Sequence, residues 1–161
     1  MRKFGLLMEL PEGKRAGFYA QIVKALAEAA NVADRDKELI VVDSEEERGR
    51  VAAVLEKYRV AWEPLELISL PEGTELDEAA EDVGFVGRSG GAYLYADRVA
   101  RFRLPRMQPA GADIAPAMLQ LEEFIRFAYD DGGQRVYCAE PHLREAVEGV
   151  AKRYGAAVEF L

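Results

Sequence analysis

The chain has 161 residues, is 50% hydrophobic, and carries a formal net charge of −8 from 21 basic and 29 acidic side chains. This length and composition predict one folded domain, or at most two very small ones, with a sizeable core. The acidic balance disfavours general nucleic-acid binding, because neutralising phosphates requires a basic face. The sequence has one cysteine and one histidine, which excludes a disulfide framework and the usual zinc-ligand sets. With no signal peptide and no membrane-spanning run, we expect a soluble, cytoplasmic protein.

The first part of the chain predicts alternating strands and helices. An apolar run at residues 4–10 predicts a buried strand, and apolar residues at helical spacing predict a helix over 14–31. The β-branched run at 39–42 predicts a strand covered on both faces. Ser44, with a glutamate three residues later, matches a capping box at a helix start. A further strand is expected within 60–70.

The last third repeats this pattern. Residues 114–129 are apolar on nearly all sides and predict one long helix, stopped by a glycine pair. Residues 135–138 predict a short strand, Pro141 suits the first position of another helix, and 156–161 predict the last strand. Such alternation predicts an α/β fold, a three-layer sandwich with a mainly parallel sheet, built from two strand–helix–strand halves.

A hairpin insertion at about 70–104 is expected to separate these halves within one domain, 1–161, with Asp97 at the hairpin turn. The two halves also share local sequence. Residues 48–63 align without gaps to 144–159 with six identities. Duplication and shared core periodicity both explain this match, so both interpretations stay open.

Cys138 and His142 form the first candidate site. Cys138 ends a predicted strand and stands just before a predicted helix, whose dipole favours a thiolate. An imidazolium four residues later would favour the thiolate further. The alternative is that Cys138 is a small buried hydrophobe and His142 a solvated residue, because free cysteines are among the most buried residue types.

The segment from Arg135 to Pro141, RVYCAEP, together with the apolar helix before it and the short strand after it, resembles the C-terminal part of DsrE/DsrF-like proteins. The resemblance covers about residues 119–161. It implies a small oligomeric α/β protein in which Cys138 would carry a persulfide during sulfur relay. The segment 70–104 has no counterpart in that family.

A second candidate site would bind an anion. A glycine-rich loop can present backbone N–H groups in a concave nest, and alternating arginines on one strand face can hold a phosphate or carboxylate bidentately. The competing interpretation is a hairpin turn whose arginines pair with the neighbouring acidic run. The residues of this predicted ligand site are Arg88, Ser89, Gly90, Gly91, Arg101 and Arg103.

Three functions from different classes follow. We favour a non-catalytic ligand-binding or regulatory protein that recognises a small anionic molecule or a protein partner. The alternatives are a DsrE-like sulfur carrier using Cys138, and an acidic interaction or inhibitor module using the six carboxylates within 72–82. No metal site, cofactor or catalytic triad is expected, and whether the protein is an enzyme stays open. The apolar 114–129 helix predicts a homo-oligomer.

Overall fold

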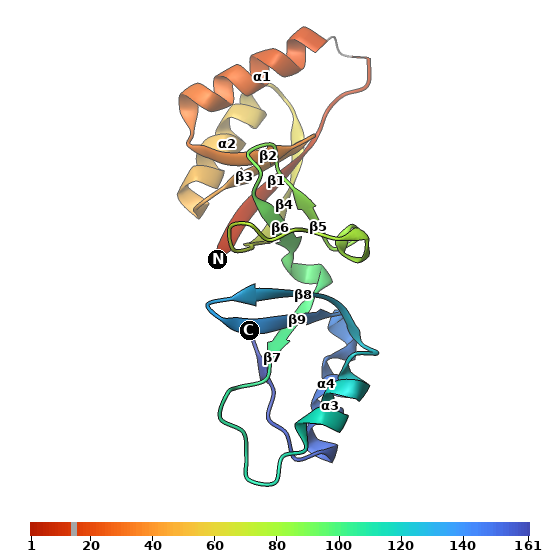
Figure 1. Cartoon of the computed structure of the whole chain (residues 1–161). Helices are drawn as coiled ribbons and strands as arrows, with labels where there is room; N and C mark the ends of the chain where they lie inside the picture. The colour runs from red at the N-terminus through yellow and green to blue at the C-terminus, as the bar shows by residue number, and fades with distance from the viewer. Residues whose placement is uncertain (14–15) are drawn as a thin grey trace. The chain divides into compact units, whose positions relative to one another are not determined.

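The computed structural model describes residues 1–13 and 16–161, and these form two compact units (Figure 1). The predicted start of the first helix at Lys14 lies outside the described residues. The 70–104 segment is not one insertion, because it is divided between the units. Unit 1 is made of Met1–Leu70 and Phe85–Tyr95, and unit 2 of Pro71–Gly84 and Ala96–Leu161.

Unit 1 is built on a six-stranded sheet of order β2-β3-β1-β4-β6-β5. The pairs β2–β3, β3–β1, β1–β4 and β4–β6 are all antiparallel. Its elements are β1 (Arg2–Glu9), α1 (Ala16–Ala29), β2 (Val32–Asp36), β3 (Leu39–Val42), α2 (Glu45–Lys57), β4 (Ala61–Ser69), β5 (Gly84–Val86) and β6 (Ala92–Tyr95).

Unit 2 is built on a four-stranded antiparallel sheet of order β10-β7-β9-β8. Its helices and strands are β7 (Ala100–Arg103), α3 (Ile114–Leu121), β8 (Ile125–Asp131), β9 (Gln134–Ala139), α4 (Arg144–Arg153) and β10 (Glu159–Phe160). Three short 3-10 helices complete the chain: η1 (Glu78–Ala80), η2 (Ala96–Arg98) and η3 (Pro141–Leu143).

The prediction of a three-layer sandwich with a mainly parallel sheet is wrong: both sheets are antiparallel. The reason is two unexpected strands, β2 and β8. Each forms a hairpin with the next strand, which converts strand–helix–strand into a β-α-β-β-α-β order. The crossover helix then joins two strands that have a third strand between them, the split β-α-β arrangement of ferredoxin-like folds. Asp97 also lies in η2 between strands of different sheets, so it is not a hairpin turn.

The two units share more than their element order. Gly5 pairs with Val41, and in unit 2 Arg101 pairs with Cys138. In the β2–β3 ladder of unit 1, Val41 pairs with Asp34. In the β8–β9 ladder of unit 2, Cys138 pairs with Phe127. Both of these ladders shift register by one residue at the same place, between Val32 and Asp34 in unit 1 and between Ile125 and Phe127 in unit 2. Shared packing does not dictate a common bulge position, so this agreement favours duplication.

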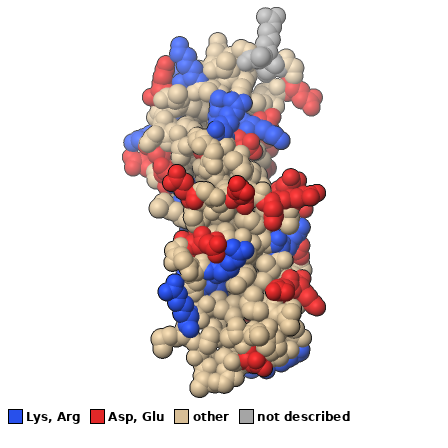
Figure 2. All heavy atoms as spheres, in the orientation of Figure 1, with Lys and Arg blue, Asp and Glu red and all other residues tan. Residues whose placement is uncertain are grey.

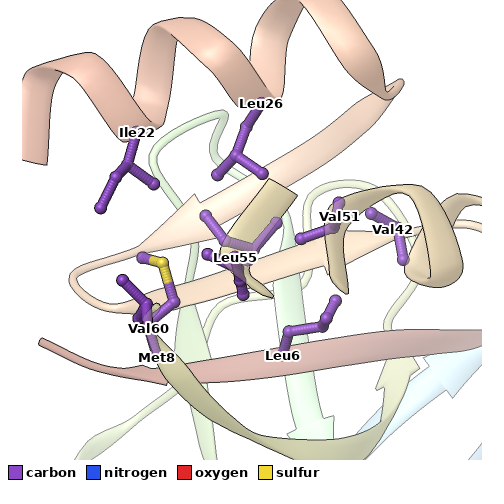
Figure 3. Close-up of a cluster of buried hydrophobic side chains, with 9 residues drawn as sticks. Leu6, Met8, Ile22, Leu26, Val42, Val51, Leu55 and Val60 are labelled. Atoms are coloured by element: carbon purple, nitrogen blue, oxygen red, sulfur yellow. The ribbon is translucent and has the colours of Figure 1, made fainter. Parts of the chain in front are cut away.

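The helices of unit 1 pack on one face of its sheet. In Figure 3, Ile22 and Leu26 of α1 and Leu55 of α2 lie over Leu6 and Met8 of β1. All five side chains are at most 2% exposed. The opposite face of the sheet forms a second apolar cluster around Leu39, Val41, Leu67 and Tyr93. The run 39–42 is therefore buried on both faces, as its sequence predicts.

Charged side chains of both signs are interspersed on the face shown in Figure 2, with no continuous basic stripe there. A duplex-binding face would gather Lys and Arg along one stripe or helix. Among the described residues, no helix combines the length and apolar character needed to cross a membrane.

Helix α2 begins with half of the predicted capping box. The Ser44 side chain accepts a hydrogen bond from the Glu47 N–H at 3.2 Å. The Glu47 carboxylate does not accept a hydrogen bond from the Ser44 N–H, which would complete the capping box. It accepts instead from the Asn31 N–H at 2.7 Å, and so ties the start of α2 to the end of α1.

Replacing Ser44 with alanine is expected to lower the free energy of unfolding by about 1 kcal/mol, since one N–H of the first helical turn loses its acceptor. Urea unfolding followed by the fluorescence of Trp62, the only tryptophan and a residue of β4, reports on unit 1. Ser69→Ala serves as the control, because Ser69 lies in β4, away from any helix start. Equal effects of the two substitutions would contradict the capping role.

Candidate functional site

Asp34 of β2 is the only charged side chain among the described residues that is buried, at 3% exposure. Its Oδ1 accepts hydrogen bonds from the backbone N–H groups of Arg35 and Ser89, at 2.8 and 2.9 Å. Its Oδ2 accepts from the hydroxyl of Tyr93 at 2.9 Å. A buried carboxylate needs such donors to offset its lost hydration. We refer to Asp34, Ser89 and Tyr93 as the Asp34 clamp.

The clamp closes the curled sheet of unit 1. β2 and β5 are the two edge strands, and the loop after β5 reaches β2 through the Ser89–Asp34 bond and a bond from the Arg88 N–H to the Arg35 carbonyl at 2.8 Å. Burial, and then the neighbouring Asp34 carboxylate, raise the pKa of Tyr93 above its usual value. Tyr93 therefore stays a neutral donor over the physiological range.

The glycines of the loop allow this close approach. A Cβ on Gly87 would collide with the Asp34 carboxylate, and one on Gly91 would lie 2.8 Å from the Tyr93 hydroxyl oxygen. Gly90 has a φ of 89°, which a residue with a Cβ rarely adopts. The loop predicted to hold an external anion thus already donates a backbone N–H to a carboxylate of the same chain.

The predicted ligand residues lie in two different units. Arg88, Ser89, Gly90 and Gly91 belong to unit 1, and Arg101 and Arg103 belong to unit 2. The first four form the exposed or partly exposed tip of the β5–β6 hairpin.

The two arginines of β7 are engaged inside unit 2. Arg101 donates to the Tyr129 hydroxyl at 3.1 Å, and Arg103 Nε donates to Glu159 at 2.9 Å. The latter bond raises the pKa of Arg103 and lowers that of the Glu159 carboxyl. In the acidic run, Asp82 forms an ion pair with Arg126 at 3.5 Å.

Cys138 and His142 are in contrasting environments. Cys138 is 1% exposed within β9, and burial raises the pKa of its thiol to about 12 despite the opposing charge of Arg101. His142 is exposed in η3, with its Nε2 3.5 Å from a Glu140 carboxylate oxygen. Because η3 separates β9 from α4, Cys138 does not stand at the start of α4. Burial outweighs the charge of Arg101, so the thiol is not activated.

Sequence reasoning missed Arg35 and the cavity that it lines. The cavity has a volume of about 190 Å³ and lies among residues of α1, β2 and β3: Val23, Leu26, Ala27, Val32, Arg35 and Ile40. Five of these six residues are apolar. No carboxylate of the described residues forms an ion pair with the half-buried Arg35. The β2 sequence, VADRD, is polar and carries no strand signal, so sequence analysis did not identify Arg35 as a site residue.

Comparison of the chain with models of known protein families finds no match, and comparison with curated protein sequences finds none either. Among the described residues there is also no group of three or more His, Cys, Asp and Glu side chains arranged to hold a metal ion. The function must therefore be argued from the geometry of the two units.

Proposed function

We propose that unit 1 is a non-catalytic binding module for a small amphipathic anion, with the apolar part of the ligand between α1 and the sheet and its carboxylate on Arg35. The observation that supports this most is an apolar cavity with Arg35 among its lining residues, together with the finding that no carboxylate of the described residues forms an ion pair with Arg35. Pockets of this kind, mostly apolar with a few polar groups, are typical of small-molecule sites. A guanidinium presents two parallel N–H donors to a carboxylate.

Two features of unit 1 support a preformed site. Leu26 and Ile40 line the cavity and belong to the buried core, so their positions are fixed by packing. Arg35 is held through its backbone, whose N–H donates to Asp34 and whose carbonyl accepts from Arg88. The backbone of Arg88, one of the predicted ligand residues, thus lies beside that of Arg35. A preorganised site loses less entropy on binding.

Hexanoate is a suitable probe, because it combines a short apolar chain with one carboxylate. We expect hexanoate to raise the stability of unit 1, by about 2.7 kcal/mol at a hundredfold excess over Kd. Hexanol and hexylamine, which share the chain but lack the negative charge, should stabilise it far less. The readout is urea unfolding followed by Trp62 fluorescence, at constant ionic strength.

Replacing Arg35 with glutamine should weaken hexanoate binding by roughly 10- to 100-fold, the loss of a charge-assisted contact. Lys24→Gln is the matched control: it removes the same charge from an exposed position on α1 and should leave the affinity unchanged. Equal binding of hexanoate and hexanol, or equal effects of the two substitutions, would overturn the proposal.

A further inference from the structure

The two units, which share their element order and bulge position, differ at the outer edge of one strand. In unit 1, both backbone groups of Arg35 bond away from β3: its N–H to Asp34 and its carbonyl to Arg88. The register places Ala128 of β8 where Arg35 stands in β2. Arg35 pairs with Ile40 and Ala128 pairs with Tyr137, and each is the second pair after the shared bulge. The backbone of Ala128 therefore faces away from β9, toward the open edge of the sheet.

No strand of the described chain pairs with this edge, although η1 packs against β8. β8 is the terminal strand of its sheet, and residues 126–131 make no backbone hydrogen bond outside the β8–β9 ladder among the described residues. An exposed row of strand N–H and C=O groups is a template for another extended chain. In unit 1 the equivalent edge is covered by the backbone of the hairpin loop at Arg88 and Ser89.

A cavity of about 410 Å³ lies beside this edge, inside unit 2. It is lined on one side by 71–75 and on the other by Ala128, Tyr129, Asp130 and Arg135. The lining residues include three acidic residues, Glu72, Glu75 and Asp130, and one arginine, Arg135, which is already paired with Asp130 at 3.1 Å. The charge of this lining is negative, so it complements a cation.

We propose that the outer edge of β8 binds an extended basic segment of a partner protein, which adds a fifth strand to the four-stranded sheet. The backbone at Ala128 supplies strand hydrogen bonds, and the cavity takes a Lys or Arg side chain of the segment beside Glu72 and Glu75. Main-chain bonds at a sheet edge give affinity, and the pocket for an alternate side chain gives specificity. This inference concerns unit 2 alone and is independent of the anion site of unit 1.

The test uses a fluorescently labelled seven-residue peptide, the length of β8, with valine and lysine alternating. We expect it to bind the full chain, with an affinity that falls as salt is raised. A peptide with glutamate in place of lysine should not bind. Equal binding of the two peptides, measured by fluorescence anisotropy, would overturn the proposal.

Ala128→Pro is the decisive variant, because it deletes one outward N–H while an edge strand tolerates proline at such a position. It should weaken peptide binding by about tenfold or more, whereas Ala128→Val, which keeps the N–H, should bind within a few fold of the original. Unchanged binding in Ala128→Pro would overturn the proposal. Circular dichroism checks that both variants fold.

The double substitution of Glu72 and Glu75 by glutamine needs no change in the sheet, because both side chains are exposed. It should weaken binding of the lysine peptide several-fold and flatten the salt dependence. Sedimentation tests the alternative that the edge binds a second copy of the chain. If the unmodified chain is a dimer and Ala128→Pro dissociates it, the edge pairs with a second copy, and the proposal of a basic partner is overturned.

Discussion

Replacing Asp34 with alanine should lower the free energy of unfolding of unit 1 by about 3–6 kcal/mol. Three donors lose their acceptor: the N–H groups of Arg35 and Ser89 and the Tyr93 hydroxyl. The two that come from other elements, Ser89 and Tyr93, contribute about 1.5–3 kcal/mol each. The loop after β5 also loses one of its two links to β2, and keeps the bond from the Arg88 N–H to the Arg35 carbonyl. The effect should be visible in urea unfolding followed by Trp62 fluorescence.

Asp36→Ala is the control for this variant. Asp36 lies two residues further along β2 and is not buried, so its loss should cost well under 1 kcal/mol. Asp34→Asn keeps one acceptor oxygen and should fall between the two. Gly87→Ala should be about as damaging as Asp34→Ala, because its Cβ would collide with the Asp34 carboxylate. If Asp34→Ala cost no more than Asp36→Ala, the clamp would not hold the sheet.

Raising the pH from 8 to 11 should destabilise the protein by about 2–3 kcal/mol through Cys138 alone. The thiol has a pKa of about 12 in the folded chain and about 8.5 when unfolded. Above the unfolded value, the unfolded chain loses this proton while the folded chain keeps it, so stability falls as the pH rises. This contribution is fully present below about pH 8.5 and is lost progressively toward pH 12.

Cys138→Ala isolates the contribution of the thiol. The variant should be somewhat less stable at pH 8, because it leaves a small cavity, but its stability should decline less on going to pH 11. Tyrosine ionisation is common to both proteins and cancels in the comparison. Urea unfolding followed by circular dichroism gives the four free energies. If the unfolding free energies of the original chain and of Cys138→Ala fell equally between pH 8 and 11, Cys138 would not be held as a buried thiol.

Alkylation of Cys138 gives an independent reading of the same environment. A thiol that is 1% exposed should react with iodoacetamide only when the protein opens. Rapid labelling of the native protein near pH 7 would instead show an exposed thiolate. That result would favour the sulfur carrier implied by the resemblance to DsrE/DsrF-like proteins over the anion-binding module.

The sequence predicts most individual elements of this protein but not their arrangement. The buried run 39–42 and the capped helix after Ser44 carry strong local signals, and both are confirmed. β2 was missed because its sequence, VADRD, offers little apolar surface. It is an edge strand, held by β3 on one side and by the Asp34 clamp on the other. A strand held at an edge in this way does not need an alternating apolar pattern in its sequence, and β2 has none.

β8 was missed for a different reason. Ile125, Phe127 and Tyr129 alternate with more polar residues, which is the two-residue period of a strand. The apolar α3 directly before it made the whole of 114–129 look like one helix, whereas α3 ends at Leu121. With β2 and β8 absent, strands and helices alternate simply, and that pattern favours parallel sheets. Two missed strands therefore changed the predicted fold class.

The candidate site was harder to predict than the fold. The sequence singles out the glycine-rich loop at 87–91 as a ligand site, but the carboxylate that the loop contacts comes from Asp34, 55 residues before Ser89. Nothing in local composition links two positions so far apart. Arg35 was overlooked for the same reason, since its role depends on a cavity assembled from three separate elements.

The chain passes between the two units three times, because the hairpin of unit 1 follows a segment of unit 2. No single cut can therefore release either unit intact, and a fragment ending at Leu70 lacks Ser89 and Tyr93. The order of synthesis is affected as well. The first four strands leave the ribosome with Asp34 still unpaired, and unit 1 can close only after Tyr95 has emerged. Until then, the edge of the sheet at β2 is uncovered and Asp34 is not yet buried. Pauses in translation near residues 71–84 should therefore prolong the exposure of this intermediate to chaperones and proteases.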